Sequence, residues 1–340
     1  IIVMNQFLNG GVENLFLSIV EKRKQDIFYL IVLNKLLDEN KINLLPENVK
    51  FLDFKEQNKF KRFLYFSRFI NTKLKHIKIM IDFHEILFCE FFMKFNSKKK
   101  YCVHWFNSNP YMRLNKNKND KYLKFYSFYK KTICICESQK ELLLKLFPKK
   151  KESDFYVSNN FVDVEKIIKS SLEKINLDFK YILMVSRVDF GAKDFFTVIK
   201  AYEKLNSALQ KEYKLVFVGD GPNFEDLKKI VSNSSVQKNI FLLGNQKNPY
   251  SFIKNATLLI QSSFSEGFSL ITLESWALET PVILSNFLCS SKELSNNENS
   301  TLLFEIGNSI QLKEKIEIVL KNNTIKEQLI LNGKKQLEHY

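Results

Sequence analysis

The sequence predicts an α/β protein built from doubly wound parallel sheets, and three observations support this fold class. Short apolar runs suited to buried strands alternate with amphipathic stretches suited to helices along the whole chain. Several of these runs end in a polar or glycine-containing turn that leads directly into a helical stretch. The 340 residues, 45% of them hydrophobic, also provide enough material for about two domains with separate cores.

The chain opens with a predicted strand, IIVMNQF, followed by a loop and a helix with apolar positions at Leu15, Phe16 and Ile19. The loop contains Gly10 and Gly11, and paired glycines let the backbone approach a ligand closely because no Cβ intervenes. These two glycines are therefore candidate ligand contacts. Because the chain starts inside this strand and without a methionine, we expect residues to precede Ile1.

Positive charge is concentrated in the N-terminal part. Residues 1–150 hold 29 basic and 14 acidic residues, whereas residues 151–340 hold 23 of each. The segment Lys59–Lys78 interleaves basic residues with phenylalanines, so it is either a core-packed helix with a solvated basic face or a helix that rests on an anionic membrane. Nucleic acid is a third possible partner, but no nucleic-acid-binding motif accompanies the basic residues.

Polar residues after Lys149 indicate a domain boundary, which we place between residues 163 and 164. Beyond it, an apolar strand over Tyr181–Val185 leads into a loop and a predicted helix with apolar Phe196, Ile199 and Leu205. Arg187 and Lys193 lie in that loop. The planar fork of arginine and the compact charge of lysine can together hold a diphosphate without a metal ion.

Two further predicted strands end in glycine-containing turns, KLVFVGDGP (214–222) and NIFLLGNQ (239–246). The first lacks the third glycine of a nicotinamide-binding fingerprint, so we reject that interpretation.

The segment Thr257–Ser285 predicts a strand, a turn, a helix from about Ser269 to Leu278, and a second buried strand after Pro281. Glu266 follows the first strand, at the carboxyl end where open α/β sheets bind ligands, and Glu274 lies about one and a half turns into the helix. Backbone amides at the helix N-terminus offer an anion site. The candidate residues at this N-terminus are Gly267, Phe268, Ser269 and Leu270.

The run EGFSLITLESWALETPVI resembles the E-x7-E signature of retaining glycosyltransferases of family 4, which have the GT-B fold. It departs from the family pattern at Trp276 and Glu279, where the family generally has methionine and glycine. SRVDFGAK is similar to the family run G-R-L-x-x-x-K-G, with Ser186 in place of a glycine, and NFVD (160–163) resembles the N-x-V-D that opens the second domain.

The resemblance implies two Rossmann-like domains, 1–163 and 164–340, with the active site in the cleft between them and a final crossing helix beyond Tyr340. It implies metal-independent, retaining transfer from a UDP-, GDP- or ADP-sugar to a glycan or lipid-linked acceptor in surface polysaccharide, lipopolysaccharide or capsule assembly. It assigns Arg187 and Lys193 to the diphosphate and Glu274 to the ribose. The remaining assignments are Glu266 and His104 as catalytic residues beside the transferred sugar, His84 on the acceptor side, and Gly10 and Gly11 facing the donor phosphates. The resemblance also makes the turn that runs from Gly244 and Asn245 to Gln246 a candidate contact for the nucleotide base through backbone groups.

Composition excludes several other classes. No apolar run approaches the roughly 18 residues of a membrane span, and we expect a cytoplasmic protein, peripheral on the inner face of the membrane. The five cysteines have no metal-binding spacing and no D-x-D pair occurs, so we expect neither cofactor nor metal. Two alternatives stay open, namely a basic nucleic-acid-binding protein on a Rossmann-like scaffold and a non-catalytic glycosyltransferase-like subunit.

Overall fold

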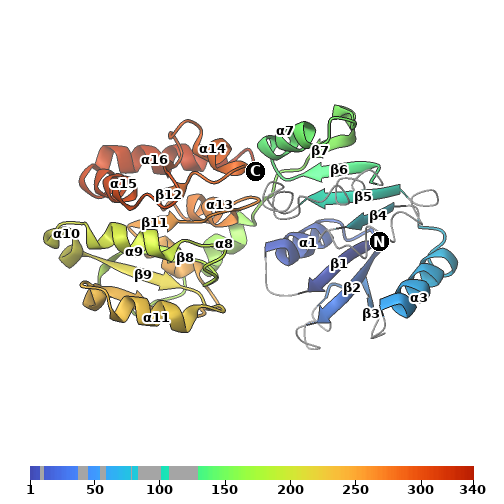
Figure 1. Cartoon of the computed structure of the whole chain (residues 1–340), viewed down its shortest axis with the longest axis horizontal. Coiled ribbons are helices and arrows are strands. Elements are labelled where there is room, and N and C mark those ends of the chain that lie inside the picture. The colour runs from blue at the N-terminus through green and yellow to red at the C-terminus, as the bar shows by residue number, and fades with distance from the viewer. Residues whose placement is uncertain (8–10, 37–44, 54–58, 78, 83–100, 107–128) are drawn as a thin grey trace. The chain divides into compact units, whose positions relative to one another are not determined.

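The computed structural model describes residues 1–7, 11–36, 45–53, 59–77, 79–82, 101–106 and 129–340. They divide into two compact units, Ile1–Asn160 and Phe161–Tyr340, and each unit contains one parallel sheet with helices around it (Figure 1). The division falls between residues 160 and 161, close to the position at which the sequence changes from basic to neutral.

In the first unit, the described strands form a seven-stranded parallel sheet in the order β3-β2-β1-β4-β5-β6-β7. The strands are β1 (Ile2–Phe7), β2 (Phe28–Leu36), β3 (Val49–Asp53), β4 (Ile79–Asp82), β5 (Tyr101–Phe106), β6 (Lys131–Cys134) and β7 (Phe155–Val157). The described helices are α1 (Gly11–Lys22), α3 (Lys59–Thr72) and α7 (Glu137–Leu146). Cys134 and Cys136 are buried, in keeping with the apolar run that contains them.

In the second unit, a six-stranded parallel sheet has the order β10-β9-β8-β11-β12-β13. The strands are β8 (Lys180–Val185), β9 (Tyr213–Val218), β10 (Ile240–Leu242), β11 (Leu258–Gln261), β12 (Val282–Ser285) and β13 (Leu302–Phe304). The helices are α8 (Val164–Ser170), α9 (Phe195–Glu203), α10 (Ser207–Glu212), α11 (Phe224–Ser232), α12 (Tyr250–Asn255), α13 (Leu270–Ala277), α14 (Ser290–Ser295), α15 (Ser309–Lys321) and α16 (Asn323–Leu337).

This strand order creates a topological switch point between β8 and β11. The chain passes outward from β8 to β9 and β10, and then crosses back so that β11 pairs with β8 on its other side. In open α/β sheets, ligands bind at the carboxyl ends of the two strands that flank such a point. The loops after β8 and β11 are therefore the expected binding loops of this unit, and they carry Arg187, Lys193 and Glu266.

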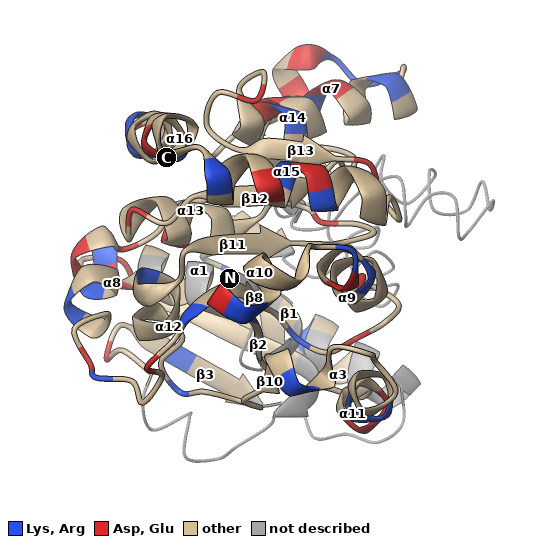
Figure 2. Cartoon of the chain, turned by 90° about the vertical axis from the view of Figure 1, so that its left-hand side faces the viewer, with Lys and Arg blue, Asp and Glu red and all other residues tan. Residues whose placement is uncertain are grey.

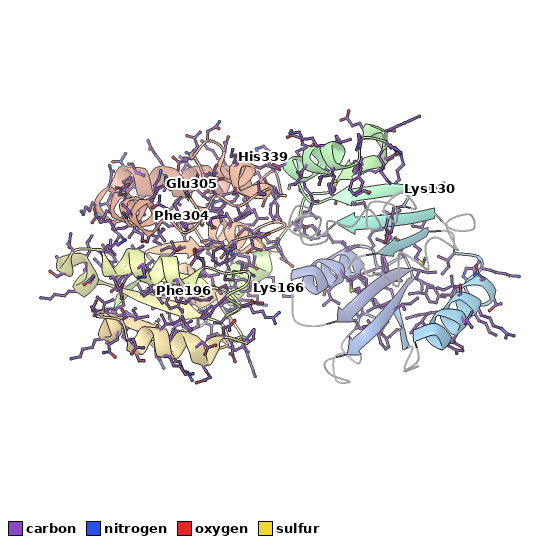
Figure 3. All side chains as sticks on the ribbon, viewed as in Figure 1. Lys130, Lys166, Phe196, Phe304, Glu305 and His339 are labelled. Carbon is purple, nitrogen blue, oxygen red and sulfur yellow. The ribbon has the colours of Figure 1, made fainter. Side chains whose placement is uncertain are left out.

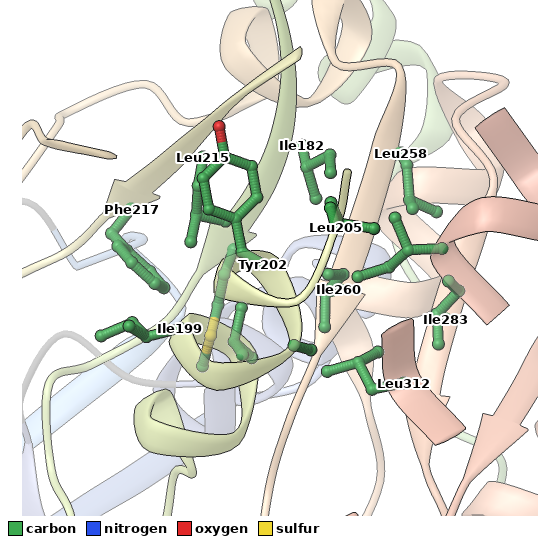
Figure 4. Close-up of a cluster of buried hydrophobic side chains, with 14 of the residues drawn as sticks. Ile182, Ile199, Tyr202, Leu205, Leu215, Phe217, Leu258, Ile260, Ile283 and Leu312 are labelled. Atoms are coloured by element: carbon green, nitrogen blue, oxygen red, sulfur yellow. The ribbon is translucent and has the colours of Figure 1, made fainter. Parts of the chain in front are cut away.

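The core of the second unit lies between its sheet and the helices packed on it. Ile182, Leu215, Leu258 and Ile260 of the sheet are fully buried against side chains of α9 and α15 (Figure 4). Tyr202 of α9 is buried in the same cluster, and its hydroxyl donates a hydrogen bond of 2.8 Å to the Tyr213 carbonyl. The tyrosine thus contributes apolar area without leaving its polar end unpaired.

The predicted apolar positions of α9 are partly wrong. Phe196 is 45% exposed, whereas Phe304 in the core is 1% exposed (Figure 3). Asp194 caps the helix by accepting a hydrogen bond of 3.0 Å from the Thr197 amide. Phe195 faces the sheet and packs on Phe217 of β9 with a centroid distance of 5.4 Å, and Phe196, the next residue, lies about 100° further around the helix. The helix also ends at Glu203, before buried Leu205.

Helices carry much of the charge on the surface of the second unit. The strands β11, β12 and β13 contain no charged residue, while basic and acidic residues are interspersed on α11, α15 and α16 (Figure 2). Several form ion pairs one helical turn apart, such as exposed Lys228 with Glu225. A neutral unit with mixed surface charge binds an anion only where a few cations gather locally, which directs attention to the switch point.

Candidate functional site

Two glycines of the turn after β9 hold the loop that carries Arg187. A Cβ on Gly219 would lie 2.0 Å from the Ser186 carbonyl oxygen, and one on Gly221 would lie 2.3 Å from that of Val188. The close approach lets the Ser186 amide donate to Val218 (3.0 Å) and the Val188 amide donate to Asp220 (3.0 Å). The G-D-G sequence therefore fixes the course of the neighbouring loop. Arg187 lies exposed at its tip.

The end of the same loop is joined to the loop after β11. The Asp194 amide donates to the Ser262 carbonyl (3.1 Å) and the Phe264 amide donates to the Ala192 carbonyl (2.9 Å), which makes Lys193 and Ser263 partners in an antiparallel bridge. Two residues 70 positions apart are thus fixed side by side by backbone geometry.

Four polar side chains form a cluster at this bridge: Lys193, Glu266, Ser263 and Gln261. Lys193 and Glu266 form an ion pair, and their side chains are only 15% and 20% exposed. The Ser263 hydroxyl donates to Glu266 Oε1 at 2.8 Å, and Gln261 Nε2 donates to the same oxygen at 3.0 Å. Lys193 also contacts the Ser263 hydroxyl at 3.2 Å. The cluster pairs opposite charges and supports them with neutral donors, as partly buried charges require.

Gln261 and Ser263 were not among the residues that the sequence pointed to. Both belong to the apolar run that ends in QSS, where polar residues close to a strand end attract no attention by themselves. Their position in the sequence could have identified them, because they close the strand run just before the turn that carries Glu266. In a parallel sheet that edge faces the ligand site.

Glu274 projects from α13 next to Tyr250, the first residue of α12. The Tyr250 hydroxyl donates to Glu274 Oε1 at 3.3 Å. Burial raises the pKa of the Glu274 carboxyl from its ordinary 4.5 to about 7, although the hydrogen bond from Tyr250 opposes this shift. Burial and the nearby Glu274 also raise the pKa of Tyr250. Glu274 is therefore held in a costly environment by the fold, which is typical of functional carboxyls.

Trp276 and Glu279, the two residues that depart from the family pattern, both contact α16. The Trp276 ring is buried against Gly333, where a Cβ would lie 2.4 Å from ring atom Cδ1. Glu279 has a left-handed backbone with φ of 58°, and its carboxylate pairs with Lys334 at 2.7 Å. Glycine adopts that conformation without strain, which gives a physical reason for the glycine in the family pattern. The tryptophan and the ion pair both tie α13 to α16.

The other predicted residues of the second unit lie near these loops. Gly244 has φ of 65°, and its carbonyl accepts a hydrogen bond of 2.8 Å from the Gly219 amide, while Asn245 is exposed. Gly267 and Phe268 precede α13, Ser269 is its N-cap and Leu270 is its first residue. The Phe268 ring packs on Tyr340 with a centroid distance of 5.3 Å.

In the first unit, the structure places only part of the predicted site. Gly10 and His84 lie outside the described residues, and Gly11 is the first residue of α1. His104 belongs to β5, where its backbone pairs with Asp82 and Thr132 in the parallel register. The strand order has a second switch point between β1 and β4. Within the described part of the chain, no group of three or more His, Cys, Asp or Glu residues is placed to hold a metal ion.

The second unit is a Rossmann-like domain with basic and acidic side chains at its switch point, where open α/β sheets bind ligands. The chain belongs to the glycosyl transferases group 1 family, whose model matches residues 165–336, half of the chain. The predicted family relationship and the GT-B architecture of two Rossmann-like domains are thereby confirmed. The assignment to family 4 and the roles of individual residues stay predictions.

Similar proteins act on different acceptors. Over 168 residues the chain is 29% identical to an "N-acetylgalactosamine-N,N'-diacetylbacillosaminyl-diphospho-undecaprenol 4-alpha-N-acetylgalactosaminyltransferase" of Campylobacter jejuni, a match covering 49% of the chain and 45% of that protein. It is 27% identical to the "Poly(glycerol-phosphate) alpha-glucosyltransferase" of Bacillus subtilis over 46% of the chain and 23% of that protein. The chain thus spans less than half the length of these relatives.

Solved structures share the fold over almost the whole chain. Alr3699/HepE of Anabaena, solved in complex with UDP-glucose, superposes with a TM-score of 0.77 at 12% identity, covering 99% of this chain and 94% of that one. A glycosyltransferase from Rickettsia africae superposes with a TM-score of 0.76 at 20% identity, covering 99% and 92%. At these identities the similarity establishes the fold alone.

The backbone strain at Glu279 can be measured. A left-handed residue other than glycine destabilises the folded state by about 1–2 kcal/mol. Glycine avoids this strain but loses more conformational entropy on folding, which costs about 0.5–1 kcal/mol relative to alanine. The exposed ion pair with Lys334 contributes at most about 1 kcal/mol. We therefore expect Glu279→Gly to be more stable than Glu279→Ala by about 0.5–1 kcal/mol in urea unfolding. Both variants lose the ion pair, so equal stabilities would contradict the strain.

The raised pKa of Glu274 predicts a pH-dependent stability. Because its folded pKa (about 7) exceeds its ordinary 4.5, the folded state takes up a proton between these values. The protonated Glu274 carboxyl therefore contributes to the free energy of unfolding fully below pH 4.5, and this contribution is lost as pH rises through about 7. We expect Glu274→Gln, which stays neutral, to melt several degrees above the parent at pH 8 and to lose this advantage near pH 5. Glu338→Gln, an exposed carboxyl on the same unit, is the control. A pH-independent difference would exclude the buried carboxyl as the cause.

Proposed function

We propose that the chain is a glycosyltransferase that moves a sugar from a nucleoside diphosphate sugar to a glycan or lipid-linked acceptor. The observation that carries the proposal is the position of Lys193 and Glu266, which come from two different loops and meet at the switch point between β8 and β11. A neighbouring cation and carboxylate suit a ligand that has both phosphates and sugar hydroxyls.

Each group has a proposed role in holding the donor. Arg187 and Lys193 bind the diphosphate, and the first turn of α13 adds backbone amides to it. Glu274 accepts hydrogen bonds from ribose hydroxyls, and Glu266 accepts them from the donor sugar. The positive groups also stabilise the charge that grows on the departing diphosphate, which is usually the largest contribution to such catalysis.

The family supports the enzyme over a nucleic-acid-binding protein. Metal independence is proposed from the absence of a D-x-D pair in the sequence and from the capacity of Arg187 and Lys193 to hold a diphosphate themselves. Retention of configuration at the anomeric carbon of the sugar is proposed from the resemblance to family 4. The departing phosphate is proposed to act as the base that accepts the proton of the acceptor hydroxyl. His104 and His84 are proposed to lie near the transferred sugar and the acceptor.

The acceptor is proposed to be lipid-linked and to draw the first unit to the inner face of a membrane. The Campylobacter relative is named for a diphospho-undecaprenol acceptor. Helix α3 exposes Leu64 (50%) and Tyr65 (60%) beside Arg68. Lys73 and Lys75, just after α3, are also exposed. A basic, partly apolar surface of this kind suits an anionic headgroup layer. No helix within the described ranges is long and apolar enough to cross a bilayer.

The donor assignment predicts that wild-type protein binds one of UDP, GDP or ADP in isothermal titration. Arg187→Ala should weaken that binding about 10- to 100-fold, because it removes a charge-assisted contact worth roughly 1.5–3 kcal/mol. The nucleoside without phosphates should be bound unchanged. Lys200→Ala, which removes an exposed cation on α9, is the matched control.

Retention of full diphosphate affinity in Arg187→Ala would remove Arg187 from the site. Failure of the wild type to bind any of the three diphosphates would contradict the proposed function. Donor binding without sugar transfer or donor hydrolysis across a panel of sugar nucleotides would indicate the non-catalytic subunit.

The membrane assignment predicts salt-sensitive co-sedimentation with vesicles that contain phosphatidylserine, and none with purely zwitterionic vesicles. Replacing Arg68, Lys73 and Lys75 together by Gln should reduce binding about 100-fold, since each cation near the surface contributes about 1 kcal/mol. A triple replacement of exposed Lys200, Lys211 and Lys238 in the second unit is the control. Equal binding to both kinds of vesicle would exclude an electrostatic contact.

A further inference from the structure

The charge of Lys193 is already compensated before any ligand binds. Its ammonium pairs with Glu266, and its one other side-chain contact among the described residues is the Ser263 hydroxyl at 3.2 Å. A diphosphate that approaches Lys193 therefore meets a nearly neutral pair, and to gain the full lysine contact it must compete with the carboxylate.

Glu266 does not depend on Lys193 for its position. Its Oε1 atom also accepts from the Ser263 hydroxyl (2.8 Å) and from Gln261 Nε2 (3.0 Å). Gln261 is 2% exposed and Ser263 is fully buried at the end of β11. Ser263 is anchored further by Ser285, whose hydroxyl accepts from the Ser263 amide at 2.8 Å and donates to its carbonyl at 2.9 Å. If Lys193 turns away, two neutral and rigidly held donors still orient the carboxylate.

We infer that Glu266 acts as a counter-charge on Lys193, so that the lysine contacts the diphosphate fully only when a donor sugar occupies Glu266. Gln261 and Ser263 are the positioning residues that keep Glu266 facing the sugar during this exchange. The inference rests on the proposed function, because it assumes a sugar nucleotide at this site. Its consequence is selectivity: the site binds the intact donor cooperatively, and it holds the nucleoside diphosphate product weakly once the sugar has left.

The inference differs from simple electrostatics in one measurable respect. If Lys193 and Glu266 acted on the diphosphate as independent charges, the effects of removing them would add. If they compete, Lys193 contributes more to diphosphate affinity when Glu266 is neutral. A double-mutant cycle on nucleoside diphosphate binding therefore separates the two explanations.

The experiment titrates UDP, with GDP and ADP as alternatives, into the full chain as wild type, Glu266→Gln, Lys193→Gln and the double variant. We expect Glu266→Gln to bind the diphosphate about fivefold or more tightly than the wild type, a typical size for coupling between sites. Lys193→Gln should cost more affinity in the Glu266→Gln background than in the wild type. The coupling should become small when the matching sugar nucleotide, UDP-glucose for UDP, is titrated instead.

Additive effects, or unchanged or weaker diphosphate binding by Glu266→Gln, would overturn the inference while leaving the proposed function intact. Absence of diphosphate binding by the wild type would overturn both. Melting temperatures of all four proteins establish that the comparison is made between folded chains.

The positioning role has its own comparison. Ser263→Ala should lower the ratio of sugar-nucleotide to diphosphate affinity, because Glu266 loses a fixed donor, and Ser263→Thr, which retains the hydroxyl, should restore it. Ser295→Ala removes a buried hydroxyl of α14 that donates to the Lys292 carbonyl, so it reports the effect of losing a buried hydroxyl that does not contact Glu266. Equal ratios for Ser263→Ala and Ser295→Ala would show that Ser263 has a structural role only.

Discussion

Two backbone hydrogen bonds, from Asp194 to Ser262 and from Phe264 to Ala192, join the loops that follow β8 and β11. They form because these strands are neighbours across the switch point, and they place Lys193 within contact of Glu266. Ordering two charged side chains out of water is costly unless the fold supplies their partners. Here the partners are supplied by rigid strand ends, so the polar cluster is already assembled before a ligand arrives, and binding loses less entropy.

Helix α13 and the turn after it also contain features that lower the stability of the fold. Glu274 is buried enough to disfavour its charged form, and the residue that ends the turn after the helix, Glu279, has a strained backbone. The fold offsets these costs by docking α13 on α16 through Trp276, which fits against a glycine. Strain and buried charge near a binding loop are tolerated when the surrounding packing over-determines the geometry.

Much of this arrangement follows from local sequence. Strand, turn and helix were predictable around Arg187 and Glu266, since apolar runs, N-caps and Pro281 act over a few residues, and α13 begins within one residue of the prediction. Contacts between segments that are distant in the sequence could not be predicted from such local patterns. The ion pair joins residues 73 positions apart, and its support by Gln261 depends on which strands are neighbours. The buried face of α9 likewise depends on a distant strand, because Phe195 packs on Phe217 of β9 while Phe196 stays 45% exposed.

The uneven distribution of charge has a physical consequence for what each unit recognises. The second unit is neutral overall, so the diphosphate site proposed for it depends on short-range attraction by Arg187, Lys193 and a helix N-terminus. At physiological ionic strength the attraction between exposed charges is screened over about 8 Å. The attraction that the excess of basic residues in 1–150 exerts is therefore confined to whatever lies close against the surface of the first unit. An anionic surface contacts many of these cations at once, so their attractions add, whereas a single small donor molecule contacts only a few of them.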